Sequence, residues 1–92
     1  MPIHYTDQLN LLKDILERQL SGSRGSVSEC EQIERLVKSL LANHVLDQRT
    51  KDILTDIYEY GQKGKYTQKL DEHIENHQDQ LVQWVNEIGQ FS

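Results

Sequence analysis

Apolar residues recur at steps of three and four along most of this chain, and this spacing constrains the fold more than any other feature. The last third shows it most clearly, with a seam of Leu70, Ile74, His77, Leu81, Trp84, Ile88 and Phe91, in which His77 is the one polar member. Because an α-helix has 3.6 residues per turn, positions spaced in this way share one helical face. No segment alternates apolar and polar residues over more than a few positions, as a half-buried strand would. The sequence therefore predicts an all-α fold.

Start and stop signals divide the pattern into four predicted helices, at residues 7–20, 26–43, 47–61 and 67–89. The candidate N-caps are Thr6 or Asp7, Ser26 or Ser28, Asp47 and Thr67. Gly61 and Gly64 are expected to end the third helix. Short connections between amphipathic helices favour antiparallel packing of sequential neighbours. We therefore expect a small up-down antiparallel bundle of four helices, with residues 1–92 forming a single domain.

The balance of charge argues against nucleic acid as a partner. Ten Lys and Arg residues against fifteen Asp and Glu residues give the 92-residue chain a formal charge of −5. Nucleic-acid binders are usually basic, because neutralising phosphates supplies much of their affinity. The basic cluster of Lys63, Lys65 and Lys69 is followed by a segment with five acids and no Lys or Arg. We therefore expect no nucleic-acid partner.

The length of the apolar runs and the cysteine content indicate in which cellular compartment the protein is expected. The longest apolar run is three residues, at 40–42, whereas a membrane span needs about 20 residues and the apolar part of a signal peptide about 7–15. The single cysteine, Cys30, has no partner for an internal disulfide. These features predict a cytoplasmic protein with no membrane partner.

His73 and His77 are the strongest candidates for chemistry. Residues four apart on a helix lie one above the other, so both imidazoles could bind one metal ion. Two histidines make only half a site, and His77 also falls on the apolar seam, where a hydrogen-bonded polar residue would serve the fold instead. Three glutamates surround Cys30 and disfavour its thiolate, which indicates a small buried apolar residue. We expect no catalytic residue and no cofactor, with a metal site at His73 and His77 as the alternative.

The length of the last predicted helix points to an interface. It spans about 23 residues, or about 34 Å, whereas the first helix spans about 14 residues, or about 21 Å. Part of its apolar face then lacks a neighbour of equal length. The overhang comprises Trp84, Ile88 and Phe91 or, at the other end, Leu70 and Ile74, unless Ile3 and Tyr5 of the N-terminal arm cover it. Exposed clusters of this kind usually mark a contact surface. We expect Trp84, Ile88 and Phe91 to bind a protein partner or a second copy in a homodimer, so that the protein acts as a non-enzymatic adaptor or regulator.

Three stretches resemble a known family. They are residues 26–40 (SVSECEQIERLVKSL), residues 9–16 and residues 83–88, and they are similar to the YtzH-like family of short proteins from Bacillus-type bacteria. The match in length would cover the whole chain. The resemblance implies a bacterial cytoplasmic protein. It implies no activity and transfers no site residues.

Overall fold

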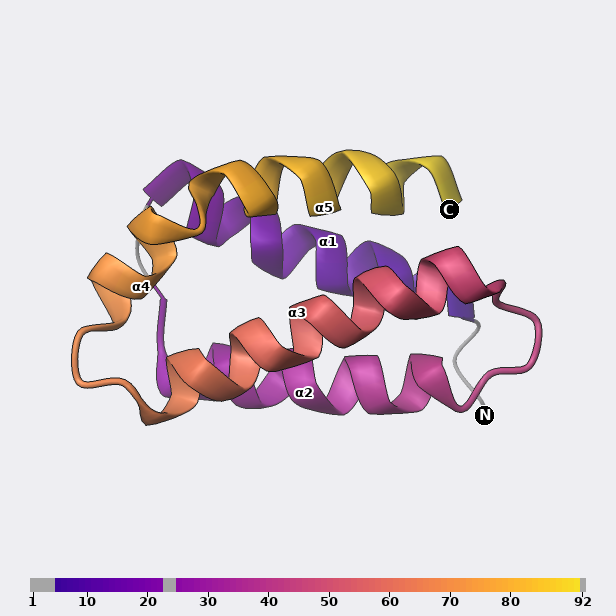
Figure 1. Ribbon diagram of the computed structural model, residues 1–92, viewed down its shortest axis with the longest axis horizontal. Coiled ribbons are helices and arrows are strands. Elements are labelled where there is room, and N and C mark those ends of the chain that lie inside the picture. Colours follow the sequence, from indigo (N-terminus) through magenta and orange to yellow (C-terminus); the bar gives the residue numbers. More distant parts are fainter. Residues whose placement is uncertain (1–4, 23–24, 92) are drawn as a thin grey trace.

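The computed structural model describes residues 5–22 and 25–91, without the side chain of Phe91, and this part of the chain forms five α-helices. They are α1 (Tyr5–Gly22), α2 (Val27–Leu41), α3 (Gln48–Tyr66), α4 (Leu70–Asn76) and α5 (Gln78–Phe91). The four longer helices alternate in direction along the long axis, and the short α4 lies at one end between α3 and α5 (Figure 1). The all-α prediction is therefore confirmed, but the helices number five in the described residues instead of four.

Two helices begin where local side-chain signals predict. The Ser26 hydroxyl oxygen accepts a hydrogen bond from the Glu29 N–H at 3.2 Å, at the start of α2. A carboxylate oxygen of Asp47 accepts one from the Thr50 N–H at 2.9 Å, at the start of α3. Each bond satisfies a backbone donor that has no partner within the first helical turn. The N-cap predictions at Ser26 and Asp47 are therefore confirmed.

The prediction that Gly61 and Gly64 end the third helix is wrong, because α3 continues past both to Tyr66. The two glycines are buried where α3 packs on α2. A Cβ atom at Gly61 would lie 3.2 Å from Cγ2 of Ile33, and one at Gly64 would lie 2.9 Å from Sγ of Cys30. The missing side chains let the two helices approach closely, and this packing offsets the weak helix propensity of glycine.

The last apolar seam runs through two helices, so the prediction of one helix from Thr67 to Gly89 is wrong. α4 ends at Asn76, α5 begins at Gln78, and His77 joins them with φ −110° and ψ 16°. Thr67 caps the C-terminal end of α3 instead of beginning a helix, and its hydroxyl oxygen accepts a hydrogen bond from the Lys69 N–H at 3.2 Å.

The break at His77 removes the overhang expected of the last helix. α5 has 14 residues and packs along the 18-residue α1 (Figure 1). Trp84 is 7% exposed and Ile88 is 1% exposed, so both belong to the core of the chain itself. The expectation that they form an exposed cluster is wrong, and the side chain of Phe91 lies outside the described residues.

The core is formed by apolar side chains from all five helices. Its buried members are Leu9, Leu12, Ile15, Leu16, Ile33, Val37, Leu40, Leu54, Ile57, Tyr60, Ile74, Leu81, Trp84 and Ile88. Ile53 is only half-buried and packs at the edge of this cluster, on the side of α3 that faces α5. Within the described residues, no helix is both long and apolar enough to cross a membrane.

Candidate functional site

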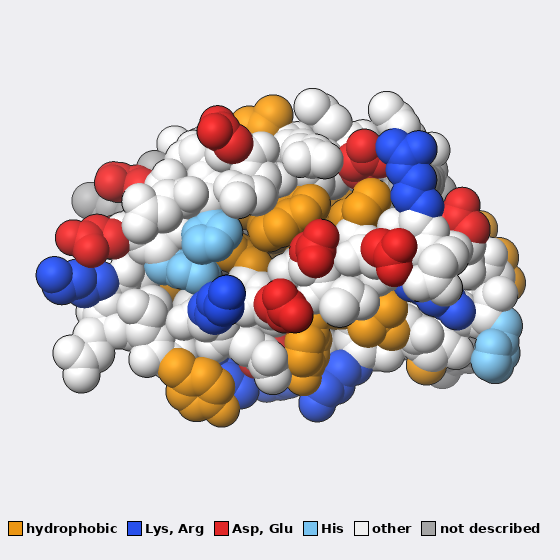
Figure 2. Space-filling view, viewed as in Figure 1, with side chains coloured by type: hydrophobic (Ala, Val, Ile, Leu, Met, Phe, Trp, Pro, Cys, Tyr) orange, Lys and Arg blue, Asp and Glu red, His pale blue; other side chains and the backbone are white. Residues whose placement is uncertain are grey.

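A groove separates α3 from α5 on one face of the molecule, with a volume of about 290 Å³. From α3 it is lined by Ile53, Asp56, Glu59, Tyr60 and Lys63. From the α4–α5 junction and α5 it is lined by His77, Gln80, Gln83 and Trp84. Figure 2 shows this face, with hydrophobic and histidine side chains in the hollow between the two helices and acidic side chains along α3. A larger hollow along α1 is more open to solvent and has no aromatic lining, so the α3–α5 groove is the better candidate site.

Four rings meet at and beneath the floor of the groove, with Tyr60 at the centre. The ring of His73 stacks on Tyr60, with centroids 4.7 Å apart and an angle of 18° between the planes. His77 and Trp84 meet Tyr60 edge-on, with centroid distances of 5.1 Å and 5.4 Å. Stacked and edge-to-face pairs are favoured by the charge distribution of aromatic rings. The floor is therefore an ordered aromatic cluster contributed by α3, α4 and α5.

Hydrogen bonds to Gln19 of α1, and others within the cluster, hold these rings in place. The Tyr60 hydroxyl donates to Oε1 of Gln19 at 2.7 Å, and Nε2 of Gln19 donates to Oε1 of Glu29 at 3.3 Å. Burial raises the pKa of the Tyr60 hydroxyl, which therefore remains a donor at neutral pH. Nε2 of His73 lies 2.9 Å from the carbonyl oxygen of Tyr60, and since a carbonyl only accepts, this nitrogen carries a proton. Nδ1 of His77 likewise donates to the His73 carbonyl at 2.7 Å.

The two walls of the groove differ in charge. α3 contributes the carboxylates of Asp56 and Glu59, with Lys63 one turn further along. α5 contributes the neutral amides of Gln80 and Gln83. All five of these residues are exposed to solvent. A ligand in the groove would therefore meet an acidic wall, a neutral wall and an aromatic floor.

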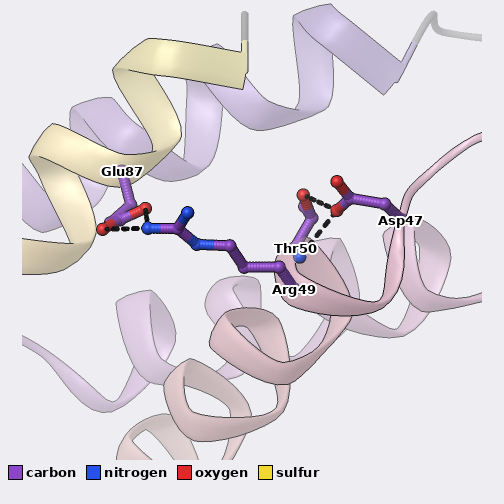
Figure 3. Close-up of polar contacts among 4 residues, drawn as sticks. All are labelled: Asp47, Arg49, Thr50 and Glu87. Atoms are coloured by element: carbon purple, nitrogen blue, oxygen red, sulfur yellow. Dashed lines mark hydrogen bonds and ion pairs between the residues drawn. The ribbon is translucent and has the colours of Figure 1, made fainter.

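An ion pair bridges α3 and α5 beyond the Ile53 end of the groove. Nη2 of Arg49 lies 3.2 Å from both carboxylate oxygens of Glu87 (Figure 3). The Asp47 carboxylate bonds to the backbone and hydroxyl of Thr50 and fixes the helical turn from which Arg49 extends. The Arg49 side chain is 71% exposed and that of Glu87 is 17% exposed. Such pairs contribute about 0–1 kcal/mol to stability, so the main effect of this one is to link the two helices locally.

The structure brings His73 and His77 together, with ring centroids 4.4 Å apart. One nitrogen of each ring is already bonded to a backbone carbonyl. Among residues 5–22 and 25–91, no group of three His, Cys, Asp or Glu side chains is placed to hold a metal ion. His73 and His77 therefore offer two ligands for a metal ion, and the described residues supply no third. The contacts of the two histidines hold Tyr60 and the α4–α5 junction in place.

Cys30 is buried against Gly64 of α3, as expected of a small apolar residue. Burial raises the pKa of its thiol to about 11, and the negative charges of Glu29, Glu34 and Glu31 contribute to the shift. The thiol is therefore neutral at physiological pH and is a poor nucleophile.

The groove could not be predicted from the sequence, because its residues come from two helices that are distant in sequence. Taken alone, Asp56 and Glu59 belong to the polar face of α3, which a single-helix pattern assigns to solvent. One signal was present in the sequence: Asp52, Asp56 and Glu59 follow each other at steps of four and three. Like charges spaced in this way disfavour a helix unless another group compensates them.

Comparison with known proteins identifies the family. The family model described as YtzH-like protein matches residues 3–88 of the chain. A relative from Bacillus subtilis (strain 168), described as "Uncharacterized protein YtzH", is 45% identical over 92 residues, and the alignment covers 100% of both chains. No solved structure matches the chain. The chain therefore belongs to the YtzH-like protein family, as its sequence resemblance indicates.

Proposed function

We propose that this member of the YtzH-like family acts by protein–protein contact, as a small adaptor or regulator without catalytic activity. The α3–α5 groove is the observation that supports the proposal. It combines an aromatic floor with an exposed polar rim, and protein interfaces have the same composition, with Tyr and Trp enriched at the centre and polar residues around them. The proposed contact surface is thus the groove and not the end of α5, where Ile88 is buried.

The order of the floor supports a binding role. A surface that is already fixed loses little conformational entropy when a partner binds. Tyr60 and Trp84 are buried apart from the edges that line the groove, and Gln19 holds the Tyr60 hydroxyl. A partner would therefore meet a preformed groove.

The nearby titratable groups are better suited to structure than to catalysis. The Cys30 thiol is neutral and buried. His73 and His77 each use one ring nitrogen to hold a backbone carbonyl. A single unpaired cysteine is typical of a reducing compartment, so the cytoplasm is the location that we propose for this contact.

Site-specific photo-crosslinking in the cells that naturally produce the protein tests the proposal. Gln83 lines the groove and is exposed, so a photoreactive phenylalanine analogue placed there should crosslink to a second protein. Its chain neighbour Val82 is also exposed but does not line the groove, so the same analogue at Val82 is the matched control. A defined adduct from position 83 that is missing from position 82 is the expected result. No adduct from position 83, or equal adducts from both, would contradict the proposal.

A further inference from the structure

We propose that the groove receives arginine side chains from a basic segment of the partner protein. This inference rests on the proposed function and names the chemistry of the contact. The groove presents carboxylates on one wall, amide oxygens on the other and aromatic rings below. A guanidinium group pairs with carboxylates through two parallel hydrogen bonds, and it also stacks on aromatic rings.

The carboxylates of the α3 wall are available for such pairing. Two other surface acids do have cationic partners within the described residues: Glu17 pairs with Lys13, and Glu31 pairs with Arg35. Asp56 and Glu59 form no ion pair within the described residues. Asp56 also has acidic neighbours at one helical turn on each side, Asp52 before it and Glu59 after it. Because such like charges repel one another, a cation bound there would relieve an unfavourable interaction in α3.

The position of Lys63 indicates which part of the groove a cation would occupy. α3 and α5 run in opposite directions (Figure 1). Lys63, near the C-terminal end of α3, therefore lies toward the end of the groove that His77 lines at the start of α5. Asp56 lies toward the opposite end, together with Gln83 and Trp84. Arg49 lies beyond this end of the groove, but its guanidinium is already paired with Glu87. The binding position for a guanidinium is therefore the Asp56 end, where the negative wall is furthest from Lys63.

The size of the groove and the charge of the chain restrict the occupant further. Pockets for drug-sized ligands have volumes of about 300–1,000 Å³, so a groove of about 290 Å³ suits one or two long side chains better than a large cofactor. A second copy of this chain has the same formal charge of −5, which opposes association through an acidic wall. A basic segment of another protein is complementary to the groove in both size and charge.

Trp84 provides a direct test in the intact protein, because it lines the groove and is the only tryptophan of the chain. The probe is a short alanine-based helical peptide with two arginines one turn apart, and the comparison peptide carries citrulline, the neutral isostere, at both positions. We expect saturable quenching or a shift of Trp84 fluorescence with the arginine peptide only. The double variant Asp56→Asn with Glu59→Gln should bind it about tenfold more weakly or worse, because charge-assisted hydrogen bonds are lost.

Asp14→Asn with Glu17→Gln is the matched control, because these acids have the same spacing on α1 and line a hollow without aromatic residues. This variant should bind the arginine peptide as the unmodified protein does. Equal loss in both variants, equal binding of the citrulline peptide, or no saturable binding would overturn the inference. Circular dichroism checks that each variant folds, and the comparison of the two peptides on the unmodified protein stands without any variant.

The peptide experiment and the crosslinking experiment can fail independently. A crosslinked partner at position 83 without arginine-peptide binding would overturn this inference alone, whereas a missing crosslink would contradict the proposed function itself.

Discussion

The ring of His73 makes the α4–α5 junction sensitive to pH. Burial lowers the pKa of His73 below its ordinary value of 6.5. The hydrogen bond to the Tyr60 carbonyl opposes this shift, while the nearby charges of His77 and Lys63 contribute to it. At pH values between the pKa of His73 in the folded protein and 6.5, the unfolded chain therefore binds more protons than the folded chain. The stability that the neutral ring contributes is fully present above about pH 6.5 and is lost as the pH falls through this window.

We predict that the melting temperature falls between pH 7.5 and pH 5.5, and that His73→Gln makes this fall smaller. The pKa of Asp47 is lowered below 3.8, chiefly by the hydrogen bond from the Thr50 hydroxyl, so Asp47 titrates below the window and does not interfere. Thermal melts followed by circular dichroism, together with an NMR titration of the His73 ring, provide the measurement. His44 is exposed, so His44→Gln should leave the contribution of His73 unchanged. A His73 pKa above 6.5 in the folded protein would contradict the prediction.

At the scale of helices, the contact between α2 and α3 depends on glycines within a helix. Replacing Gly64 by Ala improves helix propensity by up to about 1 kcal/mol, but the new Cβ would lie 2.9 Å from Sγ of Cys30 and 3.2 Å from Cδ2 of His73. Overpacking of this kind costs about 1–3 kcal/mol, so we expect Gly64→Ala to lower the free energy of unfolding. Urea denaturation measures the change.

Gly89 in α5 provides the opposite case. A Cβ there would meet only the end of the Lys13 side chain, at 3.7 Å, so Gly89→Ala should stabilise the protein by about 0.5–1 kcal/mol.

A double variant tests the cause expected for Gly64→Ala. Adding Cys30→Ala to Gly64→Ala should cost less than the sum of the two single changes, because the clashing sulfur is removed. Stabilisation by Gly64→Ala would show that α2 and α3 are not as close as described.

The helices also show which signals are local and which are not. Ser26 and Asp47 could be recognised as N-caps because each bonds to a backbone N–H three residues later. The role of Gly64 depends on Cys30, 34 positions away, so a pattern read along one helix assigns it to a helix end. The break at His77 was hidden for a related reason: the apolar seam keeps its spacing across the junction, because both short helices bury the same face.

The candidate site was less predictable than the fold for a similar physical reason. The pairing of His73 with His77 follows from their spacing in the sequence. Their stacking against Tyr60, and the position of Trp84 beside it, require α3 to pack near the α4–α5 junction. Asp56 becomes a groove residue only through the neighbouring α5. The sequence therefore predicts the His73 and His77 pair but neither its contact with Tyr60 and Trp84 nor the acidic wall above it.

For the molecule as a whole, burial of Trp84 and Ile88 changes the expected oligomeric state. Among the described residues, the exposed large apolar side chains are Leu11, Val27, Val45, Tyr66 and Val82, which belong to separate segments. Single exposed apolar residues are normal for a folded protein and do not indicate an interface. The formal charge of −5 also makes two copies repel each other.

We therefore predict that the protein sediments as a 10.8 kDa monomer at micromolar concentration in analytical ultracentrifugation. The Trp84→Ala variant distinguishes a monomer from a dimer that associates through the C-terminal end of α5. A core tryptophan replaced by alanine should cost about 3–5 kcal/mol of folding stability, which is a large part of the total for a small domain, without changing the state of association of the folded fraction. A dimer that forms at micromolar concentration and is weakened by a substitution at Trp84 would contradict the prediction. It would also make a second copy of the chain, and not a basic partner, the occupant to test in the groove.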